Sequence, residues 1–209
     1  MNNKDYHLNY FKHLNIGIEN ISYFKKKSLI ESKIFFKEIN KIFENLKLNN
    51  SRVYFFGNGA SSAFANHMAL DFSKNGKINS RSLSDSALVT ALSNDFSFEN
   101  IFVEFLNIEN IKENDFVITI SSSGNSKNIV NVLKYCKRKK IRSLALTGLN
   151  INNKSKDFSD YSLFVPLYTY GMVECIHQII LHLILDKFIG INEWNKEYPQ
   201  NMNSMDFKL

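Results

Sequence analysis

The sequence is poor in cysteine, in proline and in long apolar runs, and each shortage excludes a class of protein. Its 209 residues contain two cysteines, Cys136 and Cys175, and two prolines. Two cysteines are too few for a disulfide framework and lack metal-finger spacing, so we expect a reducing, cytoplasmic location. No apolar run approaches the roughly 20 residues of a membrane helix, and no apolar signal core is present in the N-terminus, MNNKDYHLNYFKHLN. We therefore expect no membrane association.

The chain also lacks internal repeats and a Pro/Gly-rich linker, and its length suits one well-buried domain better than two. The net charge is +6, but the basic residues are scattered among acids. The densest clusters are KKK at 25–27 and KRKK at 137–140, the second at an expected helix C-terminus, where cations suit the helix dipole. This scatter argues against nucleic acid as a partner and favours an enzyme whose anionic substrate is attracted by positive charge.

Hydrophobic periodicity predicts an α/β fold. In residues 1–50 the apolar residues recur three and four apart, which predicts two helices with a break near residues 25–28. This N-terminal helical segment is expected to pack on the core or on a neighbouring subunit. Beyond it, strands are predicted at 52–56, 80–85, 115–121, 141–148 and 161–166, with helices between them at 61–74, 86–94, 97–109 and 126–139.

That alternation predicts a doubly wound, mainly parallel five-stranded sheet flanked by helices, occupying residues 51–189. A last helix, at 170–188, is apolar around much of its circumference and is expected in a core or an oligomer interface. Residues 190–209 form a polar tail that we expect to be irregular.

Two of the predicted strands end in loops rich in small hydroxyl residues. The loops read GNGASS at 57–62 and SSSGNS at 121–126, each followed by a predicted helix. Ligands of open α/β sheets bind beyond the carboxyl ends of the strands, and hydroxyls with free N–H groups at a helix start can hold a phosphate. GNGASS also resembles the start of a dinucleotide fingerprint, with Ser62 in place of the last glycine and Asp85 as a candidate ribose-binding acid. A helix cap explains one serine of SSSGNS but not four, so we favour phosphate binding.

Two predicted helices carry histidines and carboxylates at helical spacing. His67 and Asp71 are four residues apart and share one face. Glu174 and His182 are eight apart, so their directions differ by about 80° and both can border one cleft. Two histidines and two carboxylates suit a divalent ion such as zinc, and they equally suit proton transfer. The alternative is that His67 and His182 are hydrogen-bonded core histidines, while His177 points elsewhere.

Taken together, these segments resemble the sugar isomerase (SIS) domain family, and within it the phosphoheptose isomerases. The resemblance runs from about Asn15 to Phe188, and its strongest parts are GNGASSAFANH, ALSNDFSFENIF, ISSSGNSKNIV and LALTG. It implies a homotetramer with active sites between subunits and zinc in each site. It also implies conversion of sedoheptulose 7-phosphate to D-glycero-manno-heptose 7-phosphate, the first step toward bacterial heptose for surface glycans.

The resemblance also implies residue roles. The sugar-phosphate site would be lined by Asn58, Gly59, Ala60 and Ser61, with Asn94 and Asp95 on the sugar and Ser121, Ser122, Ser123 and Ser126 on the phosphate. The family's metal and catalytic positions fall on His67, Asp71, Glu174 and His182, with Glu174 also against the substrate.

Two departures from the family pattern concern the acid–base chemistry. Asp71 stands where the family usually has glutamate, its proposed general base, and the loss of one methylene withdraws the carboxylate by about 1.5 Å. Glu174 stands where the family usually has glutamine, so a carboxylate stays in the cleft. For aldose–ketose isomerisation through an enediol, we assign the base to Asp71, with Glu174 as its substitute, and the general acid to His182.

The departures leave two other functions open. One is a catalytically silent SIS protein that binds a protein partner, like the DnaA initiator-associating protein of this family. The other is an isomerase of a different phosphosugar, since substrate choice depends on loop details. Turnover of a ketose phosphate, or its absence together with a stable protein partner, separates these functions.

Overall fold

The chain begins with a helix and a β-hairpin where the sequence predicted two helices. The computed structural model describes residues 5–192 and 194. Helix α1 (Tyr6–Glu19) is followed by strands β1 (Ser22–Lys25) and β2 (Ser28–Ile30) and by helix α2 (Ser32–Leu48). The predicted break is a two-residue hairpin turn, because Lys26 and Lys27 have φ values of 46° and 73°. Both central residues of a type I′ turn adopt such positive values.

The remaining elements follow the predicted order of strands and helices, with one addition, the short helix α7 (Lys154–Phe158). They are β3 (Arg52–Gly57), α3 (Ala60–Lys74), β4 (Asn79–Ser82), α4 (Ser86–Phe96), α5 (Ile101–Ile108), β5 (Phe116–Ile120), α6 (Lys127–Lys139), β6 (Arg142–Gly148), α7 (Lys154–Phe158), β7 (Tyr161–Val165) and α8 (Tyr170–Ile189). The strand order is β2-β1-β7-β6-β5-β3-β4. Strands β7 to β4 pair in parallel, whereas β1 pairs antiparallel with β2 and β7. The parallel five-stranded sheet is therefore confirmed, and the hairpin extends it to seven strands.

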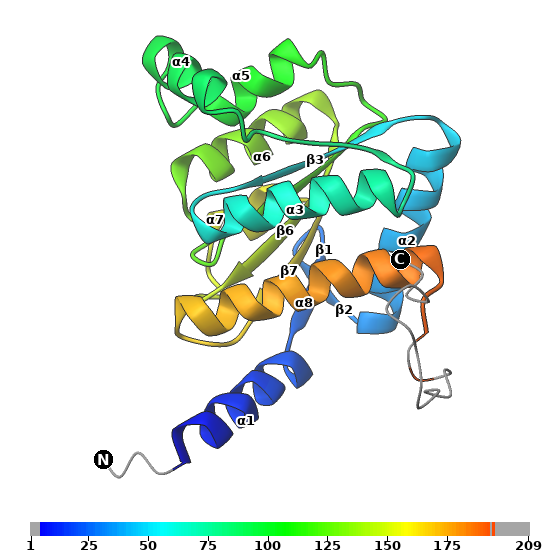
Figure 1. Cartoon of the computed structure of the whole chain (residues 1–209), viewed down its shortest axis with the longest axis vertical. Helices are drawn as coiled ribbons and strands as arrows, with labels where there is room; N and C mark the ends of the chain where they lie inside the picture. Colours follow the sequence, from blue (N-terminus) through cyan, green and yellow to red (C-terminus); the bar gives the residue numbers. More distant parts are fainter. Residues whose placement is uncertain (1–4, 193, 195–209) are drawn as a thin grey trace, which may run out of the picture.

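Helices cover both faces of the sheet, which confirms the doubly wound fold class (Figure 1). On one face α2, α3 and α8 pack together, with Phe43 and Phe72 in a shared core cluster. On the other face α5 and α6 enclose a second cluster that contains Phe102. Strand β3 contributes side chains to both clusters, because Phe55 belongs to the first cluster and Phe56 to the second. Successive side chains of a strand point to opposite faces, so an unbroken apolar strand fits this three-layer arrangement.

Helix α2 is part of the main core, whereas α1 only borders it, through Leu14 and Ile18 near its C-terminal end. Phe35 and Phe43 of α2 are fully buried. Helix α1 buries Gly17 alone among its 14 residues, and it stands away from the sheet in Figure 1. Gly17 lets α1 approach the body closely, since a Cβ there would lie 2.6 Å from Leu167 and 2.8 Å from Ile176.

The carboxyl ends of three parallel strands determine where the candidate site lies. Helices α3, α6 and α8 begin beyond the carboxyl ends of β3, β5 and β7, so their first turns gather at one edge of the sheet (Figure 1). Within the described ranges, no helix is long and apolar enough to cross a bilayer. Apart from 190–192 and 194, the predicted tail at 190–209 lies outside the described residues.

Candidate active site

A small pocket lies at this edge, between the starts of α3, α6 and α8. Its volume is about 110 Å³, and its lining residues are Asn58, Ser61, Ile120, Ser121, Ser122, Ser123, Ser126, Tyr170 and Glu174. Three segments contribute to it: the loop after β3, the loop after β5 and the first turns of α8. The structure therefore brings together both of the serine-containing loops that the sequence singled out, with Glu174 facing them.

The serine loop after β5 is held in shape mainly through its carbonyl groups, and of its serine hydroxyls Ser123 alone has a bond within the loop among the described contacts, from the Asn125 N–H at 3.2 Å. Gly124 has a φ of +62°, and a Cβ there would lie 2.5 Å from the Asn153 side chain, so glycine is required. The Gly124 carbonyl accepts hydrogen bonds from the Ser155 N–H and hydroxyl at 2.9 and 2.8 Å. The Gly148 N–H donates to the Ser122 carbonyl at 2.9 Å.

This bracing leaves polar groups of the loop available to a ligand. The Ser122 hydroxyl is buried and has no hydrogen-bond partner among the described residues. Ser126 is the N-cap of α6 but makes no side-chain cap bond. Buried polar atoms in proteins are nearly always paired, so a buried free hydroxyl beside a helix start indicates a place for a polar ligand.

The loop after β3 approaches its own helix very closely. A Cβ at Gly57 would lie 2.4 Å from the Ser61 carbonyl oxygen, and Gly59 has a φ of +55°. These two glycines let the chain turn sharply from β3 into α3. Gly59 and Ala60, predicted to contact the sugar phosphate, lie at this turn beside Asn58 and Ser61 but not in the pocket lining.

A second cluster, further along α3 and α8, contains His67, Asp71 and His182. One ligand atom from each lies within 4.8 Å of the others. Nε2 of His67 is 3.2 Å from Oδ2 of Asp71, and the two imidazole ring centroids are 5.3 Å apart. Two imidazoles and a carboxylate are a donor set that suits zinc with an open position, so these residues fit the predicted ion. Glu174, predicted as a further ligand, lies outside this cluster and lines the pocket instead.

Other predicted residues lie elsewhere. Asn94 and Asp95 are exposed in the last turn of α4, and their side chains hydrogen-bond to each other at 3.0 Å. They are absent from the pocket lining, so their contact with the sugar remains a prediction. His177 is fully buried and hydrogen-bonds to the Thr147 carbonyl at 3.2 Å, so it points into the core, away from the pocket, as expected.

Three residues at the site were not predicted from the sequence. Tyr170 lines the pocket, and it lies four residues before Glu174 on the same face of α8. The Gln178 amide nitrogen is 2.7 Å from Nε2 of His182, again at a spacing of four. Helical spacing from the predicted residues could have found both. Asn128 bonds to Asn58 across 70 residues, and no local signal marks that contact.

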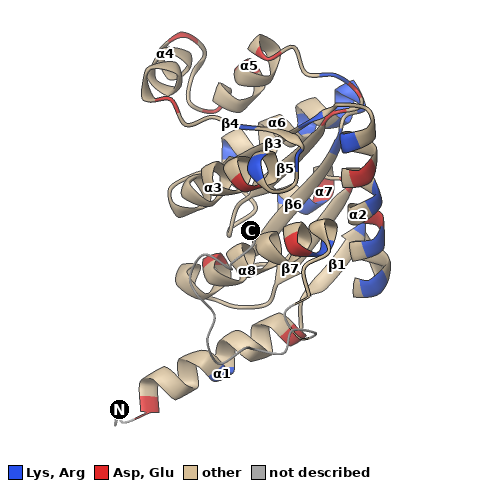
Figure 2. Cartoon of the chain, turned by 45° about the vertical axis from the view of Figure 1, so that its right-hand side comes forward, with Lys and Arg blue, Asp and Glu red and all other residues tan. Residues whose placement is uncertain are grey.

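The pocket carries negative rather than positive charge. Glu174 is an acid, and none of the described lining residues is Lys or Arg. Figure 2 shows Lys and Arg along α2 rather than at the start of α8. Hydroxyl and N–H groups are therefore the partners that this pocket offers to an anion, and the charge of Glu174 opposes them.

Comparison with known proteins assigns the family. Residues 30–148 match the family model described as SIS domain. Phosphoheptose isomerase 2 of Campylobacter jejuni is 33% identical over 142 residues, 65% of this chain and 70% of the relative. The phosphoheptose isomerase of Buchnera aphidicola subsp. Acyrthosiphon pisum is 32% identical over 170 residues, 76% of this chain and 86% of the relative. A phosphoheptose isomerase structure from Neisseria gonorrhoeae has a TM-score of 0.74 at 22% identity, covering 88% of this chain and 96% of that one.

The fold and the serine-lined pocket define a sugar-phosphate-binding class of α/β protein. The chain belongs to the SIS domain family and, within it, to the phosphoheptose isomerase branch of the phosphosugar isomerases.

Proposed function

We propose that this protein isomerises sedoheptulose 7-phosphate to D-glycero-manno-heptose 7-phosphate. The observation that carries the proposal is a serine-lined pocket with His67, Asp71 and His182 further along two of the helices that border it. His67 follows Ser61 of the pocket by six residues, about 9 Å along the helix, and His182 follows Glu174 by eight, about 12 Å. An extended seven-carbon chain with C–C bonds of about 1.5 Å and a terminal phosphate has a length of this order.

In this proposal the serine loop binds the phosphate. The free Ser122 hydroxyl and the first N–H groups of α6 are the donors. Anchoring the phosphate end converts binding energy into orientation of the carbonyl end. C1 and C2 of the sugar then lie beside His67, Asp71 and His182.

The reaction moves one proton between adjacent carbons through an enediol. Asp71 is the base that removes the proton from C1 and returns it to C2. His182 donates a proton to the C2 carbonyl oxygen to form the enediol, and it then takes the proton of the C1 hydroxyl as the C1 aldehyde forms. Glu174 is the substitute base if the sugar lies in the opposite direction, with C1 and C2 beside Glu174. In the alternative to this acid–base use, the same three residues, His67, Asp71 and His182, would hold a zinc ion. The ion, when bound, polarises a carbonyl oxygen as a Lewis acid in place of the proton from His182.

Two amide substitutions test the base assignment on sedoheptulose 7-phosphate, with the aldose product followed by NMR. Asp71→Asn is expected to lower kcat by about a hundredfold or more, because a general base is lost. Glu174→Gln is expected to keep kcat and lower KM, because it removes negative charge beside the phosphate. If Glu174→Gln abolishes turnover and Asp71→Asn does not, Glu174 is the base.

The same assay distinguishes the proposed isomerase from the two alternative functions, an isomerase of another phosphosugar and a non-catalytic SIS protein. Turnover of another ketose phosphate in place of the heptulose identifies a different phosphosugar isomerase. No turnover of any ketose phosphate, with a stable complex of a replication initiator-type partner, supports a non-catalytic SIS protein instead. The two thiols are free, with Cys136 buried and Cys175 exposed, which fits the cytoplasmic location that we propose.

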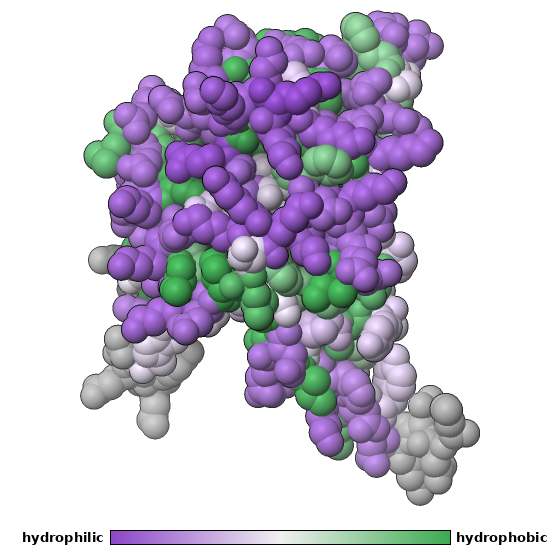
Figure 3. Space-filling view, turned by 180° about the vertical axis from the view of Figure 1, so that it is seen from behind, coloured by the Kyte–Doolittle hydropathy of each residue, from purple (hydrophilic) through white to green (hydrophobic). Residues whose placement is uncertain are grey.

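Exposed apolar side chains support a homotetramer. Tyr6, Leu8 and Phe11 of α1 are 63%, 58% and 64% exposed. Seen from behind, the molecule also displays apolar side chains gathered below its mostly hydrophilic upper part (Figure 3). A helix of 14 residues that buries one glycine gains little stability from its own chain, so we infer that neighbouring subunits cover it.

A further inference from the structure

The two loops of the pocket are joined by a pair of asparagines. Nδ2 of Asn58 donates to Oδ1 of Asn128 at 3.0 Å, and Nδ2 of Asn128 donates to Oδ1 of Asn58 at 2.9 Å. Oδ1 of Asn128 also accepts from the Ile129 N–H at 2.9 Å. Asn128 is buried, at 3% exposure, and Asn58 is half-buried. We call this reciprocal contact the amide pair.

The amide pair links two segments with different tasks in the proposed reaction. Asn58 is two residues before the start of α3, the helix that carries His67 and Asp71. Asn128 is in the first turn of α6, directly after the serine loop. Strands β3 and β5 are neighbours in the sheet, but beyond their ends the two loops are no longer paired by the sheet. The amide pair therefore continues the connection between them above the edge of the sheet.

The serine loop does not depend on the amide pair for its own shape. It is held from the other side by Ser155 and Gly148, which bond to the Gly124 and Ser122 carbonyls. The Lys154 N–H donates to Asn125 as well, at 3.0 Å. Breaking the amide pair should therefore free the start of α3 and leave the phosphate-binding loop in place.

The pair also limits what Asn58 can offer a substrate. A primary amide has two N–H donors and an oxygen with two lone pairs. Asn58 uses one N–H and one lone pair on Asn128, so half of its hydrogen-bonding capacity remains for the pocket. Its orientation is fixed by Asn128 before any ligand arrives.

We propose that Asn128 is a positioning residue that fixes the distance between the phosphate-binding serine loop and the catalytic helix α3. This inference rests on the proposed isomerase function. Because the phosphate anchors one end of the substrate and α3 carries the base for the other, an error in this distance misaligns the reacting carbons. A misplacement of about 1 Å can cost about a hundredfold in rate.

The test compares Asn128→Leu, similar in size but without hydrogen bonds, with Asn128→Asp, which keeps an acceptor for Asn58 but loses the donor. Asn40→Leu is the control, because Asn40 bonds to Glu44 on α2 at 2.7 Å, outside the pocket. For Asn128→Leu we expect kcat to fall by about ten- to a hundredfold. The inhibition constant of inorganic phosphate should stay within about twofold, since the serine loop keeps its other supports. Asn128→Asp should have a kcat between those of Asn128→Leu and the wild type.

Two results overturn the proposal. One is an unchanged kcat in Asn128→Leu. The other is a loss of kcat and phosphate binding in equal proportion to a loss of folded protein, which is a merely structural effect. Asn40→Leu should match the wild type in both constants.

A third measurement is independent of activity. If the wild type turns over no ketose phosphate, the proposed function fails, and amide hydrogen exchange without substrate then decides the role of the pair. Faster exchange in 57–63 of Asn128→Leu, relative to Asn40→Leu, with exchange in 121–126 little changed, supports the link between the loops. Unchanged exchange in 57–63 overturns it.

Discussion

Acid should destabilise this protein through one buried histidine. His177 on α8 is fully buried, and burial lowers its pKa to about 4, although the hydrogen bond to the Thr147 carbonyl partly opposes the shift. Nδ1 of His177 has no partner among the described residues. The imidazole is therefore neutral in the folded protein at pH 7, and protonating it would put an unpaired charge in the core between α8 and β6.

The sign of the effect follows from the lowered pKa. Below the ordinary pKa of 6.5, the unfolded chain binds a proton that the folded chain does not bind, so the free energy of unfolding falls. The stability is fully present above about pH 6.5 and is lost as the pH falls toward 4. At about 1.4 kcal/mol for each pKa unit, the loss is about 2 kcal/mol at pH 5 and about 3 kcal/mol at pH 4.

Urea denaturation at pH 7.5, 6 and 5, followed by circular dichroism, measures this loss. His177→Gln is the matched variant, because its amide nitrogen can donate to the Thr147 carbonyl but cannot titrate. The difference in unfolding free energy between wild type and variant should shrink by about 2 kcal/mol from pH 7.5 to pH 5. Carboxylates elsewhere, including Glu38 with its lowered pKa, act equally in both proteins and cancel. A difference that does not change with pH would refute the burial argument.

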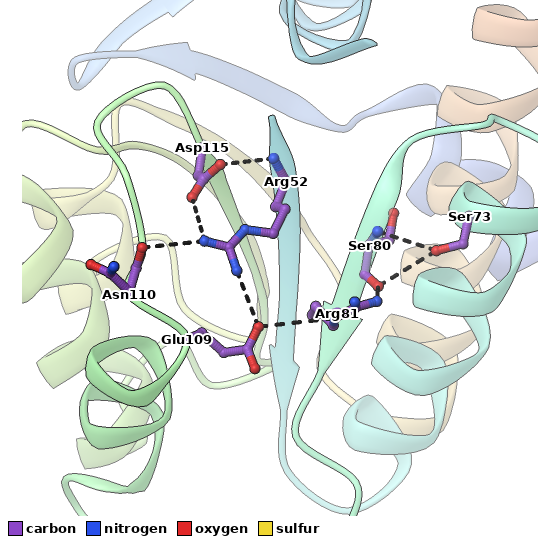
Figure 4. Close-up of polar contacts among 7 residues, drawn as sticks. All are labelled: Arg52, Ser73, Ser80, Arg81, Glu109, Asn110 and Asp115. Atoms are coloured by element: carbon purple, nitrogen blue, oxygen red, sulfur yellow. Dashed lines mark hydrogen bonds and ion pairs between the residues drawn. The ribbon is translucent and has the colours of Figure 1, made fainter. Parts of the chain in front are cut away.

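Three further predictions concern stability, metal and assembly. Asp115→Ala should lower the free energy of unfolding in urea by about 2 kcal/mol or more. Asp115 accepts a hydrogen bond from the Arg52 backbone N–H at 2.7 Å (Figure 4) and another from the Lys112 backbone N–H at 2.8 Å. The exposed Glu113→Ala should change little, and kcat should survive in both, since this network lies at the amino ends of β3 and β5. Metal analysis should find zinc in the purified wild type and a clear loss in His67→Ala; equal metal in both would remove His67 from the ligand set. Light scattering should find a tetramer for the full chain and smaller species after deletion of residues 1–19, and an oligomer unchanged by the deletion would refute a role for α1.

The sheet and the serine loops were predictable because each depends on local sequence. Strand β5 is buried along its whole length and has Thr119 as its one polar residue, so its mainly apolar sequence indicated a parallel strand covered on both sides. The SSSGNS loop follows directly, so the direction of the strand alone placed it at the ligand-binding edge.

The hairpin was missed because its turn residues are unusual. Lys26 and Lys27 both have positive φ, a conformation for which Asn and Gly are the usual signals. Two lysines between helical patterns indicate a helix break instead. Pairing of β1 with β7, about 140 residues away in sequence, is what makes the segment a strand, and such a contact has no local signature.

Spacing along a helix predicted which polar residues could meet, but not which ones do. His67 and Asp71 are one helical turn apart and are in contact, because side chains four residues apart lie next to each other on the same face of a helix. Glu174 and His182 are two turns apart, about 12 Å along the axis. Long side chains at that distance can converge or diverge according to their rotamers, and here Glu174 turns to the serines while His182 joins His67.

If the phosphate binds in the serine-lined pocket as proposed, Glu174 should make its binding weaker than an amide at this position would allow. Like unit charges about 5 Å apart repel by about 3 kcal/mol at an effective dielectric constant of about 20. The positive end of the helix dipole at the start of α6 stabilises an anion at a partly exposed site by about 1 kcal/mol. Glu174→Gln should therefore lower the inhibition constant of inorganic phosphate by about tenfold or more. If phosphate binds no better to that variant, the phosphate does not lie beside Glu174, and the direction in which the sugar is threaded through the site must be reversed.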